Sequence, residues 1–356
     1  MNTLTIVILI FSILGGVDYA FGSKFGIGKE FERGFMMLGT ISLAMIGMIV
    51  VAPLIAELLR PLFDFVYTAL HLDPSLIPAS LFANDMGGAP LASEVAKNEK
   101  IGLYNALVVS SMLGCTISFT IPFAMSTVKK EQHREVLLGM LCGIVTIPVG
   151  CFVSGLICKI PMGELLKNLL PIIIFSGIIA FGLIKFPDMC VKIFSAVAFL
   201  IKLILVAGLV FGIINFLCKK PVIPGLETIE NAGLTCLNVA IVMSGTFPLI
   251  YIVSKILQKP LDAFGKKAGI NSYSALGLIA SLATSATTFG MMDRMDKKGV
   301  MINSAFAVSA AFMFAAHLAF TMMFESSMLL PVMVGKAVSG VSSLLLAFAL
   351  YKKSGC

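Results

Sequence analysis

Apolar runs of about 20 residues recur along almost the whole of this 356-residue chain, and most charged residues lie in short stretches between them. A helix of that length spans the roughly 30 Å hydrocarbon core of a bilayer. Charged residues make up 13% of the sequence and mean hydropathy is +1.00, whereas a soluble domain carries about 25% charged residues. We therefore predict a single all-α, polytopic membrane domain over residues 1–356.

Nine of these runs are long enough for full crossings, and the first has neither the basic residues nor the cleavage site of a signal peptide. They cover residues 3–22, 34–58, 101–127, 136–158, 168–185, 193–217, 233–257, 300–323 and 327–351. Two further apolar segments are interrupted. Residues 73–96 contain three prolines and the Gly-rich stretch 84–88, and residues 271–292 contain the polar stretch 284–288.

The chain contains a weak internal repeat at an offset of 199 residues. The repeat pairs Gly34, Leu38, Pro61, Leu62, Ala106, Val109 and Ser110 with Gly233, Leu237, Pro260, Leu261, Ala305, Val308 and Ser309. It predicts one repeat at about residues 1–160, a connecting helix at about 165–186 and a second repeat at about 190–356, with the interrupted segments opposite each other. Interrupted segments at corresponding positions of two halves point to a transporter binding site, because unwound backbone supplies ligands there.

The distribution of Lys and Arg favours re-entrant interrupted segments. If both segments re-enter, the loops on one side carry seven basic residues and those on the other side seventeen; if both cross, the division is ten against fourteen. The positive-inside rule then predicts an outside N-terminus, an inside C-terminus and two inverted repeats. Eleven crossings remain an open alternative.

Ionisable residues inside hydrocarbon cost at least about 2.5 kcal/mol each on insertion scales, so they are functional candidates. The candidates are Asp18, Asp85, Lys202, His317 and Lys336. Asp85 lies in the Gly-rich break, where a carboxylate and unwound carbonyls can hold a small cation. The competing interpretation is a helix N-cap.

Polar side chains near the two breaks complete the predicted substrate site. Asn84 and Asn303 can offer oxygens or donors to an amine and a hydroxyl, and Thr284, Ser285 and Thr287 offer hydroxyls. Interhelical hydrogen bonding and packing explain these residues nearly as well.

His317 and Lys336 are predicted to act as a gate or a proton relay. His317 lies deep in an apolar run, where imidazole can carry a proton or hold a conformation. Lys336 can pair with Asp85 in the resting state. A hydrogen-bonded structural histidine and a snorkelling lysine are the alternatives.

Motifs of other protein classes are absent from the sequence. There is no P-loop, GxSxG or HExxH, and the eight cysteines form no CxxC pattern. We expect no enzyme activity, no metal, no cofactor and free buried thiols. The net charge of +7 is assigned to cytoplasmic loops, not to a nucleic-acid partner.

Several short stretches are distinctive in their order and spacing. They are residues 31–53 (FERGFMMLGTISLAMIGMIVVAP), 85–88 (DMGG), 143–150 (GIVTIPVG), 223–226 (IPGL), 289–292 (FGMM), 303–312 (NSAFAVSAAF), 317–318 (HL) and 334–336 (VGK). Over nearly the whole chain they resemble the ethanolamine transporters found in ethanolamine utilisation operons. The chain departs from that family's pattern at Asn84 (often Cys), at Ala316 (often Asp) and at Ser285 near Thr284 (often Asn-Asn). The missing acid beside His317 weakens a relay there.

The resemblance implies a bacterial cytoplasmic-membrane protein that takes up ethanolamine, mostly protonated at neutral pH, for catabolism. We predict alternating access at a midplane site where Asp85 binds the ammonium group. The partners are then the substrate and the lipid bilayer, and the oligomeric state stays open, a homo-oligomer included. The alternative is a non-transporting sensor or scaffold of the ethanolamine utilisation system, although no loop exceeds about 15 residues.

Overall fold

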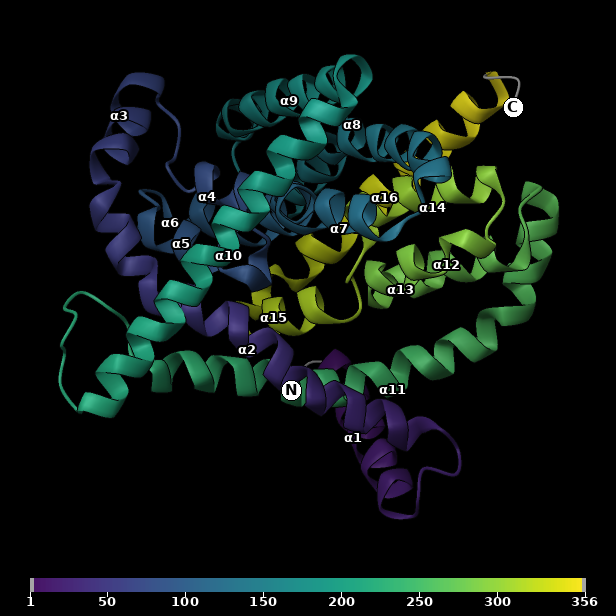
Figure 1. The fold of residues 1–356 in the computed structure, drawn as a ribbon, viewed down its shortest axis with the longest axis horizontal. Coiled ribbons are helices and arrows are strands. Elements are labelled where there is room, and N and C mark those ends of the chain that lie inside the picture. The colour runs from purple at the N-terminus through teal and green to yellow at the C-terminus, as the bar shows by residue number, and fades with distance from the viewer. Residues whose placement is uncertain (1–2, 354–356) are drawn as a thin grey trace.

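The computed structural model describes residues 3–353, and within that range it contains helices and no β-strand. This confirms the all-α prediction (Figure 1). The α-helices are α1 (Thr3–Ala20), α2 (Ile27–Leu58), α3 (Arg60–Leu70), α4 (Leu76–Leu81), α5 (Gly88–Val95), α6 (Glu99–Tyr104), α7 (Ile121–Thr127), α8 (His133–Ile157), α9 (Met162–Lys185), α10 (Pro187–Cys218), α11 (Ile229–Ala268), α12 (Ser272–Ala283), α13 (Ser285–Gly290), α14 (Lys297–Ala310), α15 (Ala316–Phe324) and α16 (Leu329–Lys353). Short 3₁₀ or π segments are η1 (Asn84–Met86), η2 (Asn105–Gly114), η3 (Thr116–Thr120), η4 (Lys130–Gln132), η5 (Met292–Arg294) and η6 (Ser326–Met328).

Seven helices of the described chain are long and apolar enough to cross a membrane. They are Ile27–Leu58, Glu99–Thr127, Lys130–Ile157, Met162–Lys185, Pro187–Cys218, Ile229–Ile256 and Ser326–Lys352. The run 300–323, expected as one crossing, is instead two helices, because the chain unwinds between α14 and α15 with Phe312 at a φ of 61°. The expected crossing 3–22 forms α1, whose apolar part is shorter than the seven spans, so the total of nine crossings stays a prediction.

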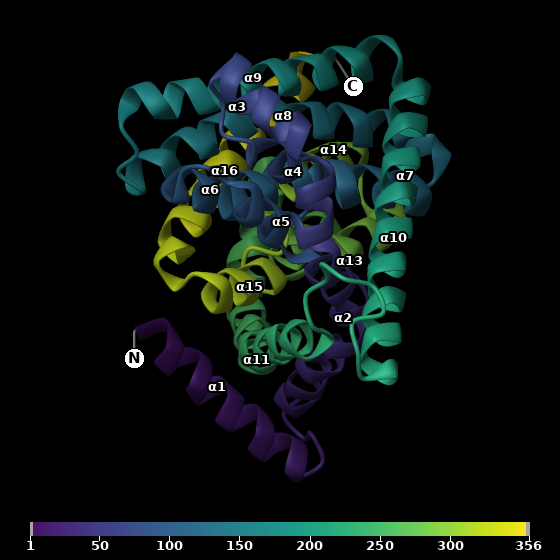
Figure 2. The ribbon, with the colours of Figure 1, turned by 90° about the vertical axis from the view of Figure 1, so that its left-hand side faces the viewer.

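The span Glu99–Thr127 forms the centre of the molecule. In an apolar 18-residue stretch of this span, 83% of the residues are buried. In a stretch of the same length in α10, which runs along one edge in Figure 2, 22% are buried. Over η2 and η3 the central span is wound as a π-helix, a form that is frequent at functional sites. In both views the short helices α5, α13 and α15 lie between α11 and the pair α8 and α9 (Figures 1 and 2).

The first interrupted segment turns back on itself. The carboxylate of Asp73 accepts hydrogen bonds from the backbone N–H groups of Lys97 and Asn98 at 3.0 and 2.9 Å. The two ends of residues 73–98 therefore lie together, with α4 and α5 as the arms and η1 at the tip. We call this segment the first hairpin.

The second interrupted segment is closed in the same way. The backbone N–H of Asn271 donates to Oδ1 of Asp296 at 2.9 Å, and the Asn271 amide donates to the carbonyl of Arg294 at 2.9 Å. Residues 271–296 form the second hairpin, with α12 and α13 as arms and extended backbone at Thr284 between them.

Matching hydrogen bonds attach each hairpin to the helix that follows it. Asn105 donates to the hydroxyl of Ser75 at 2.9 Å, and Asn303 donates to the carbonyl of Ser274 at 2.8 Å. These pairs differ by offsets of 198 and 199 residues, in agreement with the weak sequence repeat. The opposite orientation of the two halves stays a prediction.

Seven cysteines of the described chain, among them Cys115, are free thiols, and Cys356 lies outside the described residues. Most of the free thiols are buried in apolar surroundings.

Candidate functional site

The tips of the two hairpins meet at an internal cavity of about 420 Å³, which we call the central cavity. The wall draws on α2, η1, the central span, α11, the second hairpin and the unwound stretch before α15. The lining residues are Arg33, Met37, Thr40, Ile41, Ala44, Ala83, Asp85, Met86, Cys115, Phe119, Met243, Phe247, Ala283, Thr284, Ala286, Thr287, Phe312, Ala315, Ala316 and His317. Both interrupted segments of the sequence thus contribute to one site.

Asp85 reaches the cavity because the first hairpin cannot continue as a helix at its tip. Ala83 is extended, and Gly87 has a φ of 95°, which glycine adopts without steric cost. The Asp85 side chain is 16% exposed, and its Oδ1 lies 3.6 Å from Nε2 of His317. A partly exposed carboxylate in an otherwise buried break is suited to bind a cation.

His317 lies in the first turn of α15, directly after the unwound stretch, and its side chain is 1% exposed. The imidazole lies against the Phe312 ring, with 5.1 Å between ring centroids. Its Nδ1 has no hydrogen-bond partner among the described residues. Among the described residues, the imidazole therefore has one polar neighbour, the Asp85 carboxylate at Nε2, and an unpaired Nδ1 on its other side.

The second hairpin brings two hydroxyl groups to the same cavity. Thr284 occupies the break, where its Oγ1 accepts from the backbone N–H of Ala286 at 3.3 Å, and Thr287 follows in the first turn of α13. The neighbouring Thr288 points away and bonds to Ser281 and to the carbonyl of Gly277. The cavity thus has hydroxyls and a carboxylate on separate elements.

Four of the predicted site residues do not line the cavity. Asn84 and Ser285 are fully buried, and their side-chain polar atoms have no hydrogen-bond partner among the described residues. The Asn303 amide bridges α14 to Ser274 on α12, and the Lys336 ammonium donates to the carbonyl of Ser111 at 2.8 Å. Its partner Ser111 lies on the central span and is not one of the residues that line the cavity.

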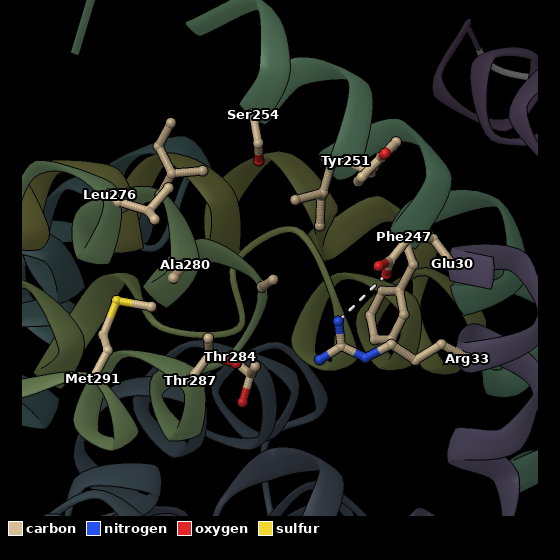
Figure 3. Close-up of a pocket in the computed structure, with 13 residues that line it drawn as sticks. Glu30, Arg33, Phe247, Tyr251, Ser254, Leu276, Ala280, Thr284, Thr287 and Met291 are labelled. Atoms are coloured by element: carbon tan, nitrogen blue, oxygen red, sulfur yellow. Dashed lines mark hydrogen bonds and ion pairs between the residues drawn. The ribbon is translucent and has the colours of Figure 1, made fainter. Parts of the chain in front are cut away.

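A smaller cavity of about 210 Å³ adjoins the central cavity, and we call it the outer chamber. Both cavities are lined by Arg33, Phe247, Ala283, Thr284 and Thr287. Figure 3 shows the Arg33 guanidinium beside the Phe247 ring, 5.3 Å from its centroid, and paired with Glu30 at 3.3 Å. Arg33 is not among the site residues predicted from the sequence, although it lies within the distinctive stretch 31–53.

Seven apolar helices long enough to cross a membrane define the class of this protein as a multi-pass helical membrane protein. The chain belongs to the family described as "Ethanolamine utilisation protein, EutH", whose model matches residues 1–350. This confirms the family resemblance.

Similar proteins cover nearly the full chain. A protein of Listeria monocytogenes named "Probable ethanolamine permease EutH" is 42% identical over 339 residues, 94% of this chain and 90% of its own. The Escherichia coli protein of the same name is 35% identical over 356 residues, 92% of this chain and 86% of its own. A Bacillus subtilis protein named "Uncharacterized protein YxeR" is 34% identical over 342 residues, 96% and 92% of the two chains. No solved structure matches the chain.

Proposed function

We propose that this protein carries ethanolamine, as the ethanolammonium cation, across the bacterial cytoplasmic membrane by alternating access. Two relatives named as ethanolamine permeases and membership of the family support the substrate. The observation that carries the proposal is Asp85, the one carboxylate among the described residues that line the central cavity. A single carboxylate in a largely apolar wall favours a small cation.

In this proposal Asp85 binds the ammonium group of the substrate, and the Thr284 and Thr287 hydroxyls bind its alcohol. His317 positions the carboxylate, with its Nε2 3.6 Å from Oδ1 of Asp85. The cavity of about 420 Å³ is larger than a two-carbon amino alcohol, so the substrate shares it with water. Asn84 becomes part of the cavity lining when the first hairpin moves. Asn303, Ser285 and Lys336 are buried outside the lining and stabilise the elements that form it.

The small size of the substrate limits its affinity. At the ceiling of about 1.5 kcal/mol per non-hydrogen atom, the four such atoms of ethanolamine supply about 6 kcal/mol, which corresponds to a Kd of roughly tens of micromolar. The single carboxylate therefore supplies a large share of the binding free energy. Its loss cannot be compensated by the surrounding apolar wall.

The membrane potential is sufficient to drive uptake of a cation. An inside-negative potential contributes about 2.3 kcal/mol per charge per 100 mV, which corresponds to roughly fiftyfold accumulation. A uniporter would therefore concentrate ethanolammonium without a second ion. Coupling to protons through Asp85 and His317 is the alternative mechanism.

Uptake of labelled ethanolamine into proteoliposomes, with and without an inside-negative potential, tests the proposal. We expect potential-driven uptake that Asp85→Asn abolishes, while Asp188→Asn, the same change at an exposed site in the first turn of α10, leaves it intact. Full uptake by Asp85→Asn would remove the assignment of Asp85. No uptake by folded wild-type protein under any gradient would overturn the transport function in favour of a sensor or scaffold.

A further inference from the structure

Three cavities follow one another along α2. Glu30 and Arg33 line the outer chamber, residues 33–44 line the central cavity, and residues 53–57 line a third cavity of about 480 Å³ beyond it. We call this third cavity the distal vestibule; it also borders Arg60, Asp64 and the end of α5. At 1.5 Å per residue, about 14 Å of helix separates Ala44 from Pro53.

An apolar seal fills the interval between the central cavity and the distal vestibule. Met48, Val51 and Ala52 of α2 are buried there in one cluster with Leu91 and Val95 of α5. No such seal lies between the central cavity and the outer chamber, which share part of their wall. The described conformation is therefore closed toward the vestibule alone.

Met48 packs directly against the tip of the first hairpin. A Cβ placed on Gly87 would lie 1.8 Å from Cγ of Met48, so the methionine rests on bare glycine backbone. Only glycine at this position allows the hairpin tip to approach α2 so closely. At the Met48–Gly87 contact, no space remains between α2 and the hairpin tip.

Unpaired polar atoms lie beside the seal. Both amide atoms of Asn84, next to Asp85 at the hairpin tip, are buried and have no hydrogen-bond partner among the described residues. The same holds for the hydroxyl of Thr321 on α15, which packs against η1. Buried polar groups without partners are costly, and water entering from the vestibule would satisfy them.

The contacts of α2 indicate which side of the seal moves. Gly47 and Gly208 bring the backbones of α2 and α10 together, since a Cβ on Gly47 would lie 1.9 Å from the carbonyl oxygen of Leu205. Such backbone contact holds α2 to α10. The first hairpin has short arms of six and eight residues and is the smaller body.

We propose that the substrate route runs along α2 from the outer chamber to the distal vestibule, and that the Met48–Gly87 contact is its closed gate in this conformation. The gate opens when the first hairpin moves away from α2, which hydrates Asn84 and exposes Asp85 to the vestibule. This inference rests on the proposed transport function and adds the direction of the route and the residue that closes it.

Accessibility of introduced cysteines tests the gate without any transport. Thr40→Cys reports on the central cavity and Ala56→Cys on the distal vestibule. A charged, membrane-impermeant methanethiosulfonate is added to right-side-out or inside-out membrane vesicles, and modification is read from peptide masses. We expect Cys at 40 to react from the outer-chamber face only and Cys at 56 from the vestibule face only.

Opening the seal should change this pattern. Met48→Ala, and Met48→Gln as a variant that keeps the volume, should make the reporter at position 40 react at least tenfold faster from the vestibule face. Leu43→Ala, on the exposed side of α2, is the matched control and should change nothing. Each variant is first checked for a monodisperse, folded state.

Three results overturn the gate: reaction at position 40 from the vestibule face in the otherwise wild-type protein, no change with either folded Met48 variant, or an equal change with Leu43→Ala. If any of these results is found together with normal ethanolamine uptake, the proposed gate is wrong and the proposed transport function stands. The expected labelling combined with absent uptake keeps the route and removes the proposed substrate.

Discussion

Asp85 and Lys336 are opposite charges in the same part of the molecule, but they have different surroundings. Asp85 borders the central cavity, whereas Lys336 is 1% exposed and its ammonium donates to one carbonyl of the π-helical central span. A buried ammonium costs free energy that one hydrogen bond does not recover, so its presence is better explained by function than by stability. The same distinction separates Thr287, which lines the cavity, from Thr288, which does not.

Replacing Lys336 by methionine should separate stability from transport. Lys336→Met keeps an unbranched side chain one atom shorter and removes the buried charge, so the thermal unfolding temperature should not fall while uptake falls at least tenfold. Lys202→Met, on the exposed side of α10, is the matched control and should leave uptake unchanged. A lower unfolding temperature with normal uptake per folded molecule would show that Lys336 is structural.

Thr287→Val should weaken substrate binding without affecting the fold. The hydroxyl is lost with little change of shape, and one neutral hydrogen bond contributes about 0.5–1.5 kcal/mol, so KM for ethanolamine should rise roughly two- to tenfold. Uptake kinetics over a range of ethanolamine concentrations measure this. The same change at Thr288 should lower stability and leave KM as it is, because its hydroxyl bonds inside the second hairpin. Equal KM values for the two variants would contradict the assignment.

At the scale of elements, the two hairpins are the parts that make this helical bundle a candidate transporter. Each is closed at its mouth by an aspartate that accepts backbone hydrogen bonds, Asp73 in the first and Asp296 in the second. Closing the mouth fixes where the tip lies, and the tip carries the polar residues. Loss of the hydrogen bonds of either aspartate should make the residues at the tip of that hairpin more mobile.

Asp73→Ala should selectively destabilise the first hairpin. The variant loses charge-assisted hydrogen bonds to Lys97 and Asn98, each contributing about 1–3 kcal/mol, so hydrogen exchange within residues 73–98 should accelerate tenfold or more. Asp64→Ala, which removes only an exposed ion pair with Lys97, is the control and should change exchange little. Equal hydrogen-exchange rates within residues 73–98 in the two variants would show that the hydrogen bonds of Asp73 do not stabilise the hairpin.

At the scale of the whole molecule, the order of the cavities along α2 relates the fold to the direction of transport. The outer chamber lies at the end of α2 that carries Glu30 and Arg33, and the positive-inside rule assigns that end to the cytoplasm. With that orientation the described conformation is open to the inside. The distal vestibule then faces the outside, the side from which the proposed function requires the substrate to enter.

Reporter fusions test this orientation. Green fluorescent protein fused after the C-terminus should fluoresce, and alkaline phosphatase at the same place should be inactive, because the excess of Lys and Arg predicts a cytoplasmic C-terminus. The N-terminus should give the opposite result. An active phosphatase at the C-terminus would reverse the orientation and with it the assignment of outer chamber and vestibule.

The sequence by itself determined the class of the protein, the two interrupted segments and the place of Asp85 in the first of them. These follow from local properties: the length of an apolar run, and prolines or glycines that prevent a helix from continuing. The break at residues 311–315 could not be predicted in this way, since that stretch contains neither glycine nor proline. Only the tertiary structure decided that Arg33 and Thr287 face the cavity while Asn303 and Lys336 bond to neighbouring helices. The direction in which a polar side chain points depends on which helix packs beside it, and residues far apart in the chain determine that packing.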